Sequence, residues 1–236
     1  MNSSNHIKID CGDSDALVWV KQDCTIDKKT LITVPSGYRV QVTCGSQKIN
    51  PMIAPCNSAN IMEVLGLGKK DFKSNDVYSF YYSITSGRAL NFIWGTGSTA
   101  RDREYEIDFS WGANGEYTIS IEDPVRLFEN IGKTNPLTTD HLEKIYIEVV
   151  SRITTVITQF IADKSVHCFD LNARKDEIQK TVTANLNQFR EIPDTMGISI
   201  KAITVKEVSI PSDEERGRLS EVIKQRREKK DKKGGE

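Results

Sequence analysis

The sequence of 236 residues lacks an apolar run long enough to cross a membrane. Its longest uncharged stretch, 49–62, is interrupted by two prolines and three asparagines, whereas a membrane-spanning helix needs about 18 or more apolar residues. The first fifteen residues have neither the basic segment nor the apolar segment of a secretory signal. We therefore expect a cytoplasmic protein with no membrane-spanning segment.

The cysteines are few, and their spacing does not favour a disulfide framework or a metal site. The sequence has five, an odd number, and no Cys-x-x-Cys pair. This spacing favours reduced thiols over a disulfide framework and leaves a zinc site as a less favoured alternative. His167 is followed by Cys168, but neighbours in an extended segment point to opposite faces. We therefore expect no catalytic residue, no metal ligand and no cofactor.

Charge is balanced overall but not along the chain. The net charge is −1, yet residues 216–233 contain nine Lys or Arg and only three Asp or Glu, which gives this segment a net charge of about +6. The aromatic residues between 105 and 117 have acidic rather than basic neighbours. A nucleic acid would be repelled there, so we expect no nucleic-acid partner.

Apolar, aromatic and β-branched residues predict five strands in the first part of the chain. The predicted strands are 16–20, 31–34, 38–44, 77–84 and 89–94. Apolar and polar residues alternate in 38–44, which predicts a strand with one buried face. Pro35-Ser36-Gly37 predicts a turn before it. Residues 45–70 show no regular period and predict no element.

The clearest β pattern lies between residues 104 and 121. Aromatic and β-branched residues alternate with polar residues over 105–111 and again over 117–121. The intervening segment, 112–115, ends in Asn-Gly, so we predict an antiparallel hairpin. Its solvent face would display the carboxylates of Glu104, Glu106, Asp108 and Glu116. A second glycine-containing segment, 94–97, predicts a turn rather than a phosphate loop, because the third glycine and a following helix are missing.

Helical periodicity dominates the second part of the chain. Apolar residues three and four apart predict an amphipathic helix to Ile161. Thr139 or Asp140 would be its N-cap, with Glu143 completing a capping box. A second helix would run from about Asn172 and end before Pro193.

Three further elements complete the prediction. Gly197 precedes a predicted strand over 198–210, Asp123-Pro124 opens a short helix that ends at Gly132, and Ser212 caps a final helix. Strands followed by helices and a returning strand favour an α+β domain. We divide the chain into a polar segment 1–15, the domain 16–211 (β-rich over 16–122, helical with a closing strand over 123–211) and a basic helix and tail 212–236.

Several motifs resemble the SPFH (stomatin/prohibitin/flotillin/HflK-C, or band 7) family over about residues 16–223. The motifs are Leu31-Ile32-Thr33-Val34-Pro35-Ser36-Gly37-Tyr38-Arg39 followed by Gly45, Phe92-Ile93-Trp94-Gly95-Thr96-Gly97, Gly115-Glu116-Tyr117, Asp123-Pro124, Leu137-Thr138-Thr139, Asp170-Leu171 and Ser209-Ile210-Pro211. The later motifs resemble the soluble bacterial branch that is called virion-core-protein-like. The resemblance implies an SPFH/band-7-like fold, in which an antiparallel sheet packs with amphipathic helices.

The resemblance also implies a function without catalysis. It points to a homo-oligomeric scaffold that organises partner proteins at or near the inner face of the cell membrane, with membrane stress response as the expected process. The sequence departs from many relatives because only one short charged helix stands where they have a long coiled coil. The alternative is a hydrolytic or metal-dependent enzyme that uses the carboxylates of the predicted hairpin or the pair His167 and Cys168.

Candidate contact residues follow from this interpretation. For an oligomer interface the candidates are Leu219, Val222 and Ile223 on the final helix, with Tyr146 and Ile147 on the long helix. For contact with anionic lipid the candidates are Arg226, Arg227, Lys229 and Lys230, because each Lys or Arg near such a surface contributes about 1 kcal/mol.

Overall fold

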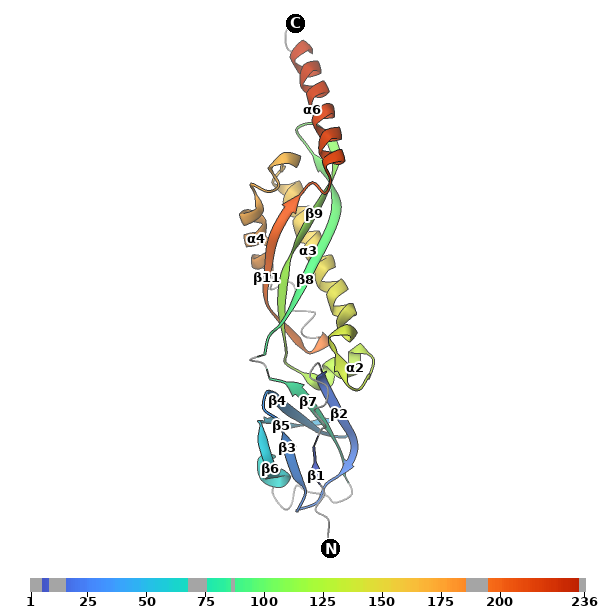
Figure 1. The fold of residues 1–236 in the computed structure, drawn as a ribbon, viewed down its shortest axis with the longest axis vertical. Helices are drawn as coiled ribbons and strands as arrows, with labels where there is room; N and C mark the ends of the chain where they lie inside the picture. Colours follow the sequence, from blue (N-terminus) through green and yellow to red (C-terminus); the bar gives the residue numbers. More distant parts are fainter. Residues whose placement is uncertain (1–5, 9–15, 68–75, 86–87, 186–194, 234–236) are drawn as a thin grey trace. The chain divides into compact units, whose positions relative to one another are not determined.

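The computed structural model describes residues 6–8, 16–67, 76–85, 88–185 and 195–233 (Figure 1). It has the predicted α+β class, with antiparallel sheets and amphipathic helices. The chain forms two compact units. The first comprises residues 1–89, 120–145 and 192–199, and the second comprises 90–119, 146–191 and 200–236.

The first unit is mainly β. Its larger sheet has the order β10-β2-β7-β4-β5, with every printed pair antiparallel. The strands are β10 (Leu137–Thr138), β2 (Ala16–Thr25), β7 (Val77–Ile84), β4 (Tyr38–Cys44) and β5 (Gln47–Ile53). A smaller sheet has the order β1-β3-β6, from β1 (His6–Ile7), β3 (Leu31–Val34) and β6 (Cys56–Asn60). The strands predicted at 31–34, 38–44 and 77–84 are confirmed, and the one at 16–20 extends to Thr25.

Strand β4 differs from the prediction of one exposed face. Gln41 and Thr43 are buried as well as the apolar residues, because β4 lies inside the sheet between β7 and β5. The Gln41 amide donates to the Ile49 carbonyl at 2.7 Å, which satisfies it in the core. The unassigned stretch 45–70 contains β5, β6 and the one-turn helix α1 (Ile61–Val64). Strand β5 pairs with the preceding strand β4 across the turn at Gly45 and Ser46. Strand β6 pairs with β3, more than 20 positions earlier, which no local period reveals.

Helix α2 (Pro124–Ile131) forms as predicted. Asp123 is its N-cap and accepts from the Arg126 N–H, and Gly132 ends it. Phe128 packs edge-on against Tyr81 of β7, with ring centroids 5.9 Å apart. The Gly197 carbonyl accepts from the N–H of Asp123 at 2.8 Å.

The second unit is built on a sheet of order β11-β9-β8, from β11 (Ile198–Ser209), β9 (Ile107–Ile121) and β8 (Leu90–Asp102). The predicted hairpin between 105 and 121 is wrong, because 107–121 is a single strand. Its partner is β8, and the reversal lies at 103–106, where Glu106 has φ 52°. The alternation of buried and exposed residues in fact continues through 111, 113 and 115, a signal that the Asn-Gly pair obscured.

The predicted turn at 94–97 is wrong for the same reason. These residues lie in the middle of β8, with Gly97 opposite Gly112 of β9. Residues Gly95–Asp102 extend β8 well beyond the predicted end at residue 94. The strand predicted at 198–210 is confirmed as β11.

The long helix α3 (Glu143–Asp163) follows the 3-10 turn η1 (Thr139–Leu142). The N-cap lies one residue before Thr139, the first of the two predicted positions. Thr138 is the N-cap, and His141, not Glu143, completes the box by accepting from the Thr138 N–H at 3.1 Å. A histidine ring nitrogen can accept in the same way as the expected carboxylate.

Within the second unit, α3 runs along the sheet (Figure 1). The Thr154 and Thr96 hydroxyls are 2.6 Å apart, and the predicted apolar stripe is buried. By length and composition alone, Thr139–Asp163 could cross a membrane, with mean hydropathy 1.3. This helix does not stand out as a long uncharged stretch of sequence, because Glu148 and Arg152 interrupt it. A core helix of a soluble protein meets the same test.

Two more helices belong to the second unit. Helix α4 (Lys175–Ala184) buries Ile178 and Val182, as predicted. The predicted continuation through Leu186 and Phe189 to Pro193 lies outside the described residues. Helix α6 (Asp213–Lys233) begins after Ser212, whose hydroxyl accepts from the Glu215 N–H at 3.1 Å, which confirms the predicted cap.

Candidate functional site

The chemical groups converge most closely around Asp102, the last residue of β8. Its side chain is buried. One carboxylate oxygen, Oδ1, accepts from the N–H groups of Glu104 and Tyr105, at 3.0 and 3.2 Å. These bonds fix the side chain at the start of the β8–β9 reversal. Asp102 is a buried carboxyl group held by backbone donors, and no local sequence pattern marks it.

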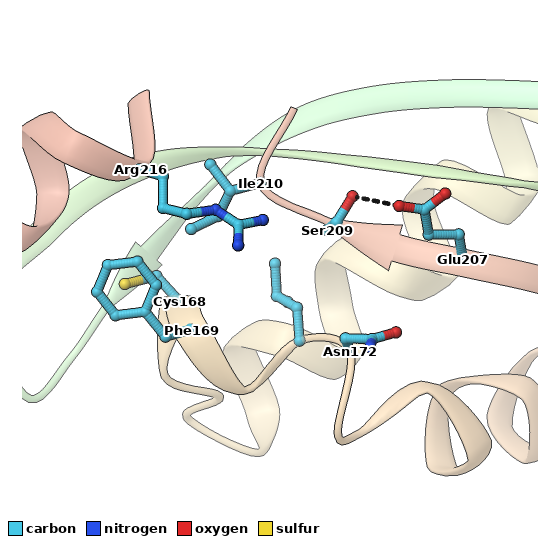
Figure 2. Close-up of a pocket in the computed structure, with 8 residues that line it drawn as sticks. Cys168, Phe169, Asn172, Glu207, Ser209, Ile210 and Arg216 are labelled. Carbon is cyan, nitrogen blue, oxygen red and sulfur yellow. Dashed lines mark hydrogen bonds between the residues drawn. The ribbon is translucent and has the colours of Figure 1, made fainter. Parts of the chain in front are cut away.

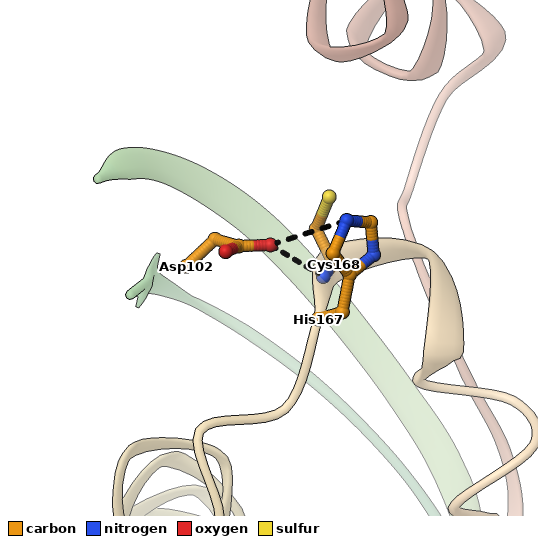
Figure 3. Close-up of side chains that lie close together, drawn as sticks. All are labelled: Asp102, His167 and Cys168. Atoms are coloured by element: carbon orange, nitrogen blue, oxygen red, sulfur yellow. Dashed lines mark hydrogen bonds and ion pairs between the residues drawn. The ribbon is translucent and has the colours of Figure 1, made fainter. Parts of the chain in front are cut away.

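His167 and Cys168 approach the other oxygen of Asp102 (Figure 3). The Cys168 N–H donates to Oδ2 at 3.1 Å, and Nε2 of His167 lies 3.7 Å from the same atom. The prediction that neighbouring side chains at 167 and 168 must diverge is wrong. Residue 167 is extended, but the chain turns at once into the 3-10 helix η2 (Cys168–Asp170). That turn brings both side chains to one side.

The two nitrogens of the His167 ring have different environments. Nδ1 accepts from the Phe169 N–H at 3.1 Å, so His167 is the N-cap of η2. The ring proton of the neutral imidazole is therefore on Nε2. Nε2 is buried and has no hydrogen-bond partner among the residues that the structure describes, because 3.7 Å to Asp102 is too long for a hydrogen bond.

The Cys168 thiol is not activated as a nucleophile. Burial, followed by the charge of Asp102 and a hydrogen bond to it, raises the pKa of Cys168 to about 12. A catalytic cysteine instead needs a lowered pKa and a base that removes its proton. In this cluster the carboxylate faces the thiol itself, so the three residues do not form a Cys-His-Asp catalytic relay.

Two cavities lie beside the cluster. One, of about 320 Å³, is lined by Cys168, Phe169, Leu171, Asn172, Glu207, Ser209, Ile210 and Arg216. Figure 2 shows that the guanidinium of Arg216 and the side chain of Cys168 border this cavity from α6 and η2. The other, of about 350 Å³, is lined by His167, Phe169, Ser220, Ile223, Lys224, Arg227 and Glu228. Water can therefore approach the cluster from the Cys168 side and from the His167 side.

Helix α6 is attached to the β8–β9 reversal through Tyr105. Arg227 donates to the Tyr105 hydroxyl at 2.8 Å, and its guanidinium lies 5.3 Å from the centroid of that ring. Arg226 donates to the Tyr105 carbonyl. The Tyr105 ring also packs edge-on against His167, with ring centroids 5.3 Å apart. Tyr105 thus joins the buried cluster to the helix.

Charged residues near the start of α6 bond to the backbone of β9. Glu215 accepts from the Ser110 N–H at 3.4 Å, and Arg218 donates to the Asp108 carbonyl at 3.3 Å. Leu219 and Ile223 are buried. Helix α6 is therefore packed on its own chain.

The structure places the candidate interface residues in different environments. Leu219 and Ile223 are buried within the chain, while Val222 is half-buried. Tyr146 is half-buried against Tyr117, at 6.5 Å between ring centroids. Ile147 is 58% exposed. Of the predicted set, Ile147 is the residue with the largest free apolar surface.

The candidate lipid-contact residues also lie in different environments. Arg226 and Arg227 bind Tyr105, whereas Lys229 is exposed. The side chain of Lys230 lies outside the described residues. Sequence reasoning could not find the Tyr105 contacts, because they join residues more than 120 positions apart.

The carboxylates of the wrongly predicted hairpin do not gather into a site. Asp108 pairs with Arg101 at 3.7 Å, and Glu116 pairs with Lys206. Glu104 and Glu106 are exposed at the reversal. These groups lie on the solvent face, as expected for residues that alternate with the core. The aromatic residues Tyr105, Phe109, Trp111 and Tyr117 are buried, as also expected.

Comparison with known proteins identifies the type of domain. The sequence profile of the SPFH domain-Band 7 family matches residues 56–226. The match runs from β6 into α6 and includes the cluster and the lining of the first cavity, whereas Arg227 and Glu228 of the second cavity lie beyond its end. No curated protein shows significant similarity to the chain.

Proposed function

The chain belongs to the SPFH domain-Band 7 family, and from this premise we propose that it is a non-catalytic scaffold that self-associates and organises partner proteins close to a membrane. Assignment to the soluble bacterial virion-core-protein-like branch and a role in membrane stress response are parts of the same proposal. Both rest on the sequence resemblance. The structural support for self-association is an open edge of one β-sheet.

The observation that favours self-association is the outer edge of β8. In the sheet β11-β9-β8, β9 pairs with one side of β8 along its whole length. Within the described ranges, the backbone on the other side of β8 makes no hydrogen bond. Residues 90–100 contain neither a charge nor a proline, although these are the usual means of blocking an exposed edge. Such an edge is a template for a further strand.

The opposite edge of the same sheet is blocked. Gln179 of α4 donates to the Ile203 carbonyl at 2.9 Å and accepts from the Val205 N–H at 2.5 Å. Its side-chain amide thus takes the place of a neighbouring strand on β11. The contrast makes β8 the edge at which the sheet can extend.

We propose a second copy of the chain as the occupant. Antiparallel pairing of two β8 strands about a two-fold axis at Thr96 would place Arg101 opposite Asn91 and Ile93 opposite Thr99. No like charges would then face each other. Ile93 is 78% exposed in the single chain and would gain a neighbour. The edge is therefore complementary to itself.

This proposal gives α6 a different role from the one expected. Because Leu219 and Ile223 are buried in their own chain, α6 has little apolar surface left for a coiled-coil seam. Ile147 and Tyr146 of α3 remain candidates for further contacts. For a contact with anionic lipid, the helix offers the exposed Lys224 and Lys229.

The alternative, a hydrolytic or metal-dependent enzyme, has less support. The carboxylates that it would use are spread over the solvent face, and the Cys168 thiol is protonated at neutral pH. The convergence of His167 and Cys168 with Asp102 is the one observation in its favour. A hydrolase would lose its activity on the change Cys168→Ser, whereas a scaffold would keep its assembly.

Molar mass measured by light scattering over a range of protein concentrations tests the proposal. We expect a mass above that of one chain, and a shift to monomer on Ile93→Lys, which places a charge on the β8 edge. Ala202→Lys, a change at an exposed residue of β11, is the matched control and should leave the mass unchanged. A monomer at every concentration, or equal effects of the two changes, would overturn self-association through β8.

A further inference from the structure

We propose that Asp102, His167 and Cys168 form a binding site for one thiophilic divalent cation of the zinc class. The proposal concerns the buried cluster and does not depend on self-association. It adds a ligand to a domain for which the sequence predicted no metal ligand. The residues come from β8 and from the start of η2, so the site would join two elements that are 65 positions apart.

The spacing of the ligand atoms fits a tetrahedral cation. The carboxylate oxygen, the imidazole nitrogen and the sulfur lie within 4.8 Å of one another. With bonds of about 2.0–2.3 Å, two ligands of a tetrahedral zinc ion are about 3.3–3.8 Å apart. For a nitrogen and an oxygen, whose bonds to zinc are about 2.0–2.2 Å, the expected separation is about 3.3–3.6 Å, and the 3.7 Å between Nε2 of His167 and Oδ2 of Asp102 lies just above it. It is too long for a hydrogen bond but suits two atoms that share a cation.

The unsatisfied nitrogen is an independent reason to expect a ligand. Nε2 of His167 is buried and adjacent to a buried carboxylate, and within the described part of the chain it has no hydrogen-bond partner. A buried polar atom without a partner is unusual in a native structure, and an unfilled ion site is one explanation. A cation between Nε2 and Oδ2 would satisfy both atoms.

The hydrogen bonds around Asp102 orient its carboxylate for binding a cation. The N–H groups of Glu104, Tyr105 and Cys168 donate to its two oxygens and fix their orientation, as outer-shell donors do at metal sites. Oδ2 accepts only one of these bonds, so it keeps capacity for a cation. The cavities beside Cys168 and His167 provide access, together with room for a water molecule as the fourth ligand.

Binding of the cation would change the protonation of Cys168 and His167. The thiol of Cys168 loses its proton to solvent and binds as the thiolate. The neutral His167 ring moves its proton from Nε2 to Nδ1, so the Phe169 N–H loses its acceptor. One proton is therefore released for each cation bound, and the N-cap of η2 is exchanged for a metal bond.

Titration of the untagged, metal-stripped chain with Co²⁺ tests the proposal. We expect one equivalent to bind, with a thiolate-to-metal absorption band in the near ultraviolet, release of about one proton per cation, and displacement of the band by Zn²⁺. The changes Cys168→Ser and His167→Gln should each weaken binding by more than about 100-fold, beyond the loss that follows removal of an outer-shell partner. Cys24→Ser and His6→Gln, at residues outside the cluster, are the matched controls.

Each possible result of the titration either supports or overturns the metal site. A wild-type chain that shows no thiolate band overturns the proposal, as does a band that survives Cys168→Ser or disappears with Cys24→Ser. Circular dichroism of each metal-free variant shows whether it is folded. If Cys168→Ser unfolds the chain, His167→Gln decides, because its ring is partly exposed and is not part of the hydrophobic core.

Discussion

Gly115 of β9 faces the Thr204 carbonyl of β11 so closely that a Cβ atom at position 115 would lie 1.9 Å from that oxygen. The same Cβ would lie 2.8 Å from the Trp94 ring. The glycine is therefore required by the approach of the neighbouring strand. The residue that suggested a turn in the sequence is instead a point of close packing in the middle of the sheet.

The change Gly115→Ala should accordingly destabilise the fold. The neighbour that would have to move is backbone, so we expect a loss of about 3 kcal/mol, at the upper end for overpacked sites. Gly95→Ala is the matched control, because a Cβ there meets nothing within 4 Å. Urea unfolding followed by circular dichroism measures both, and equal stabilities would contradict the packing described.

Gln179 should protect the edge of β11. The change Gln179→Ala leaves the Ile203 carbonyl and the Val205 N–H without their partner, which should cost about 1–2 kcal/mol. It should also raise the tendency to aggregate, because a second edge of the sheet becomes open. Thermal unfolding with simultaneous light scattering tests this. The nearby change Thr183→Ala, which removes only a side-chain partner of Gln179, should have a smaller effect.

Asp123 should make the stability of the first unit depend on pH. Burial opposes its ionisation, but the bonds from Lys48 and the Arg126 N–H outweigh it and lower the pKa of Asp123. A lowered folded-state pKa gives stability that is present above the unfolded value of about 3.9 and is lost as the pH falls through the folded value. Asp123→Asn keeps the N-cap and removes the charge. We expect it to cost about 1 kcal/mol at pH 7, with the difference from wild type shrinking below pH ~4. Urea unfolding at pH 7 and pH 3 measures it, and a constant difference would contradict the assignment.

The double change Arg226→Gln with Arg227→Gln should loosen α6 from the β8–β9 reversal. It removes the hydrogen bonds to Tyr105 and the cation over its ring, which together should contribute about 1–2 kcal/mol. Hydrogen exchange of the α6 amides should become faster. The control, Lys224→Gln with Lys229→Gln, removes the same charge from exposed positions and should leave exchange unchanged.

The same pair of variants should behave in the opposite way towards anionic vesicles. If α6 contacts lipid, the exposed lysines lie free to do so, so Lys224→Gln with Lys229→Gln should weaken vesicle co-sedimentation at low salt by about tenfold or more. The arginine variant should weaken it less, because Arg226 and Arg227 are engaged with Tyr105. Equal losses would show that the contact depends on net charge alone.

Elements whose signals are local follow from the amino-acid sequence without further information. The turn at Gly37, the caps at Asp123 and Ser212, the stripe of α3 and the strand that follows Gly197 all depend on residues within a few positions of one another. Backbone conformation and side-chain periodicity act over that distance, and these predictions are confirmed. The α+β class and the motifs of the family follow from them.

Tertiary structure alone decided the features that depend on distant partners. Strand β9 is continuous because β8 pairs along its whole length, which overrides the Asn-Gly turn signal. The cluster of Asp102, His167 and Cys168 exists because η2 turns against the end of β8, and α6 is folded onto Tyr105 by side chains from the far end of the chain. Burial and hydrogen bonding between segments decide such contacts, and no local propensity encodes them.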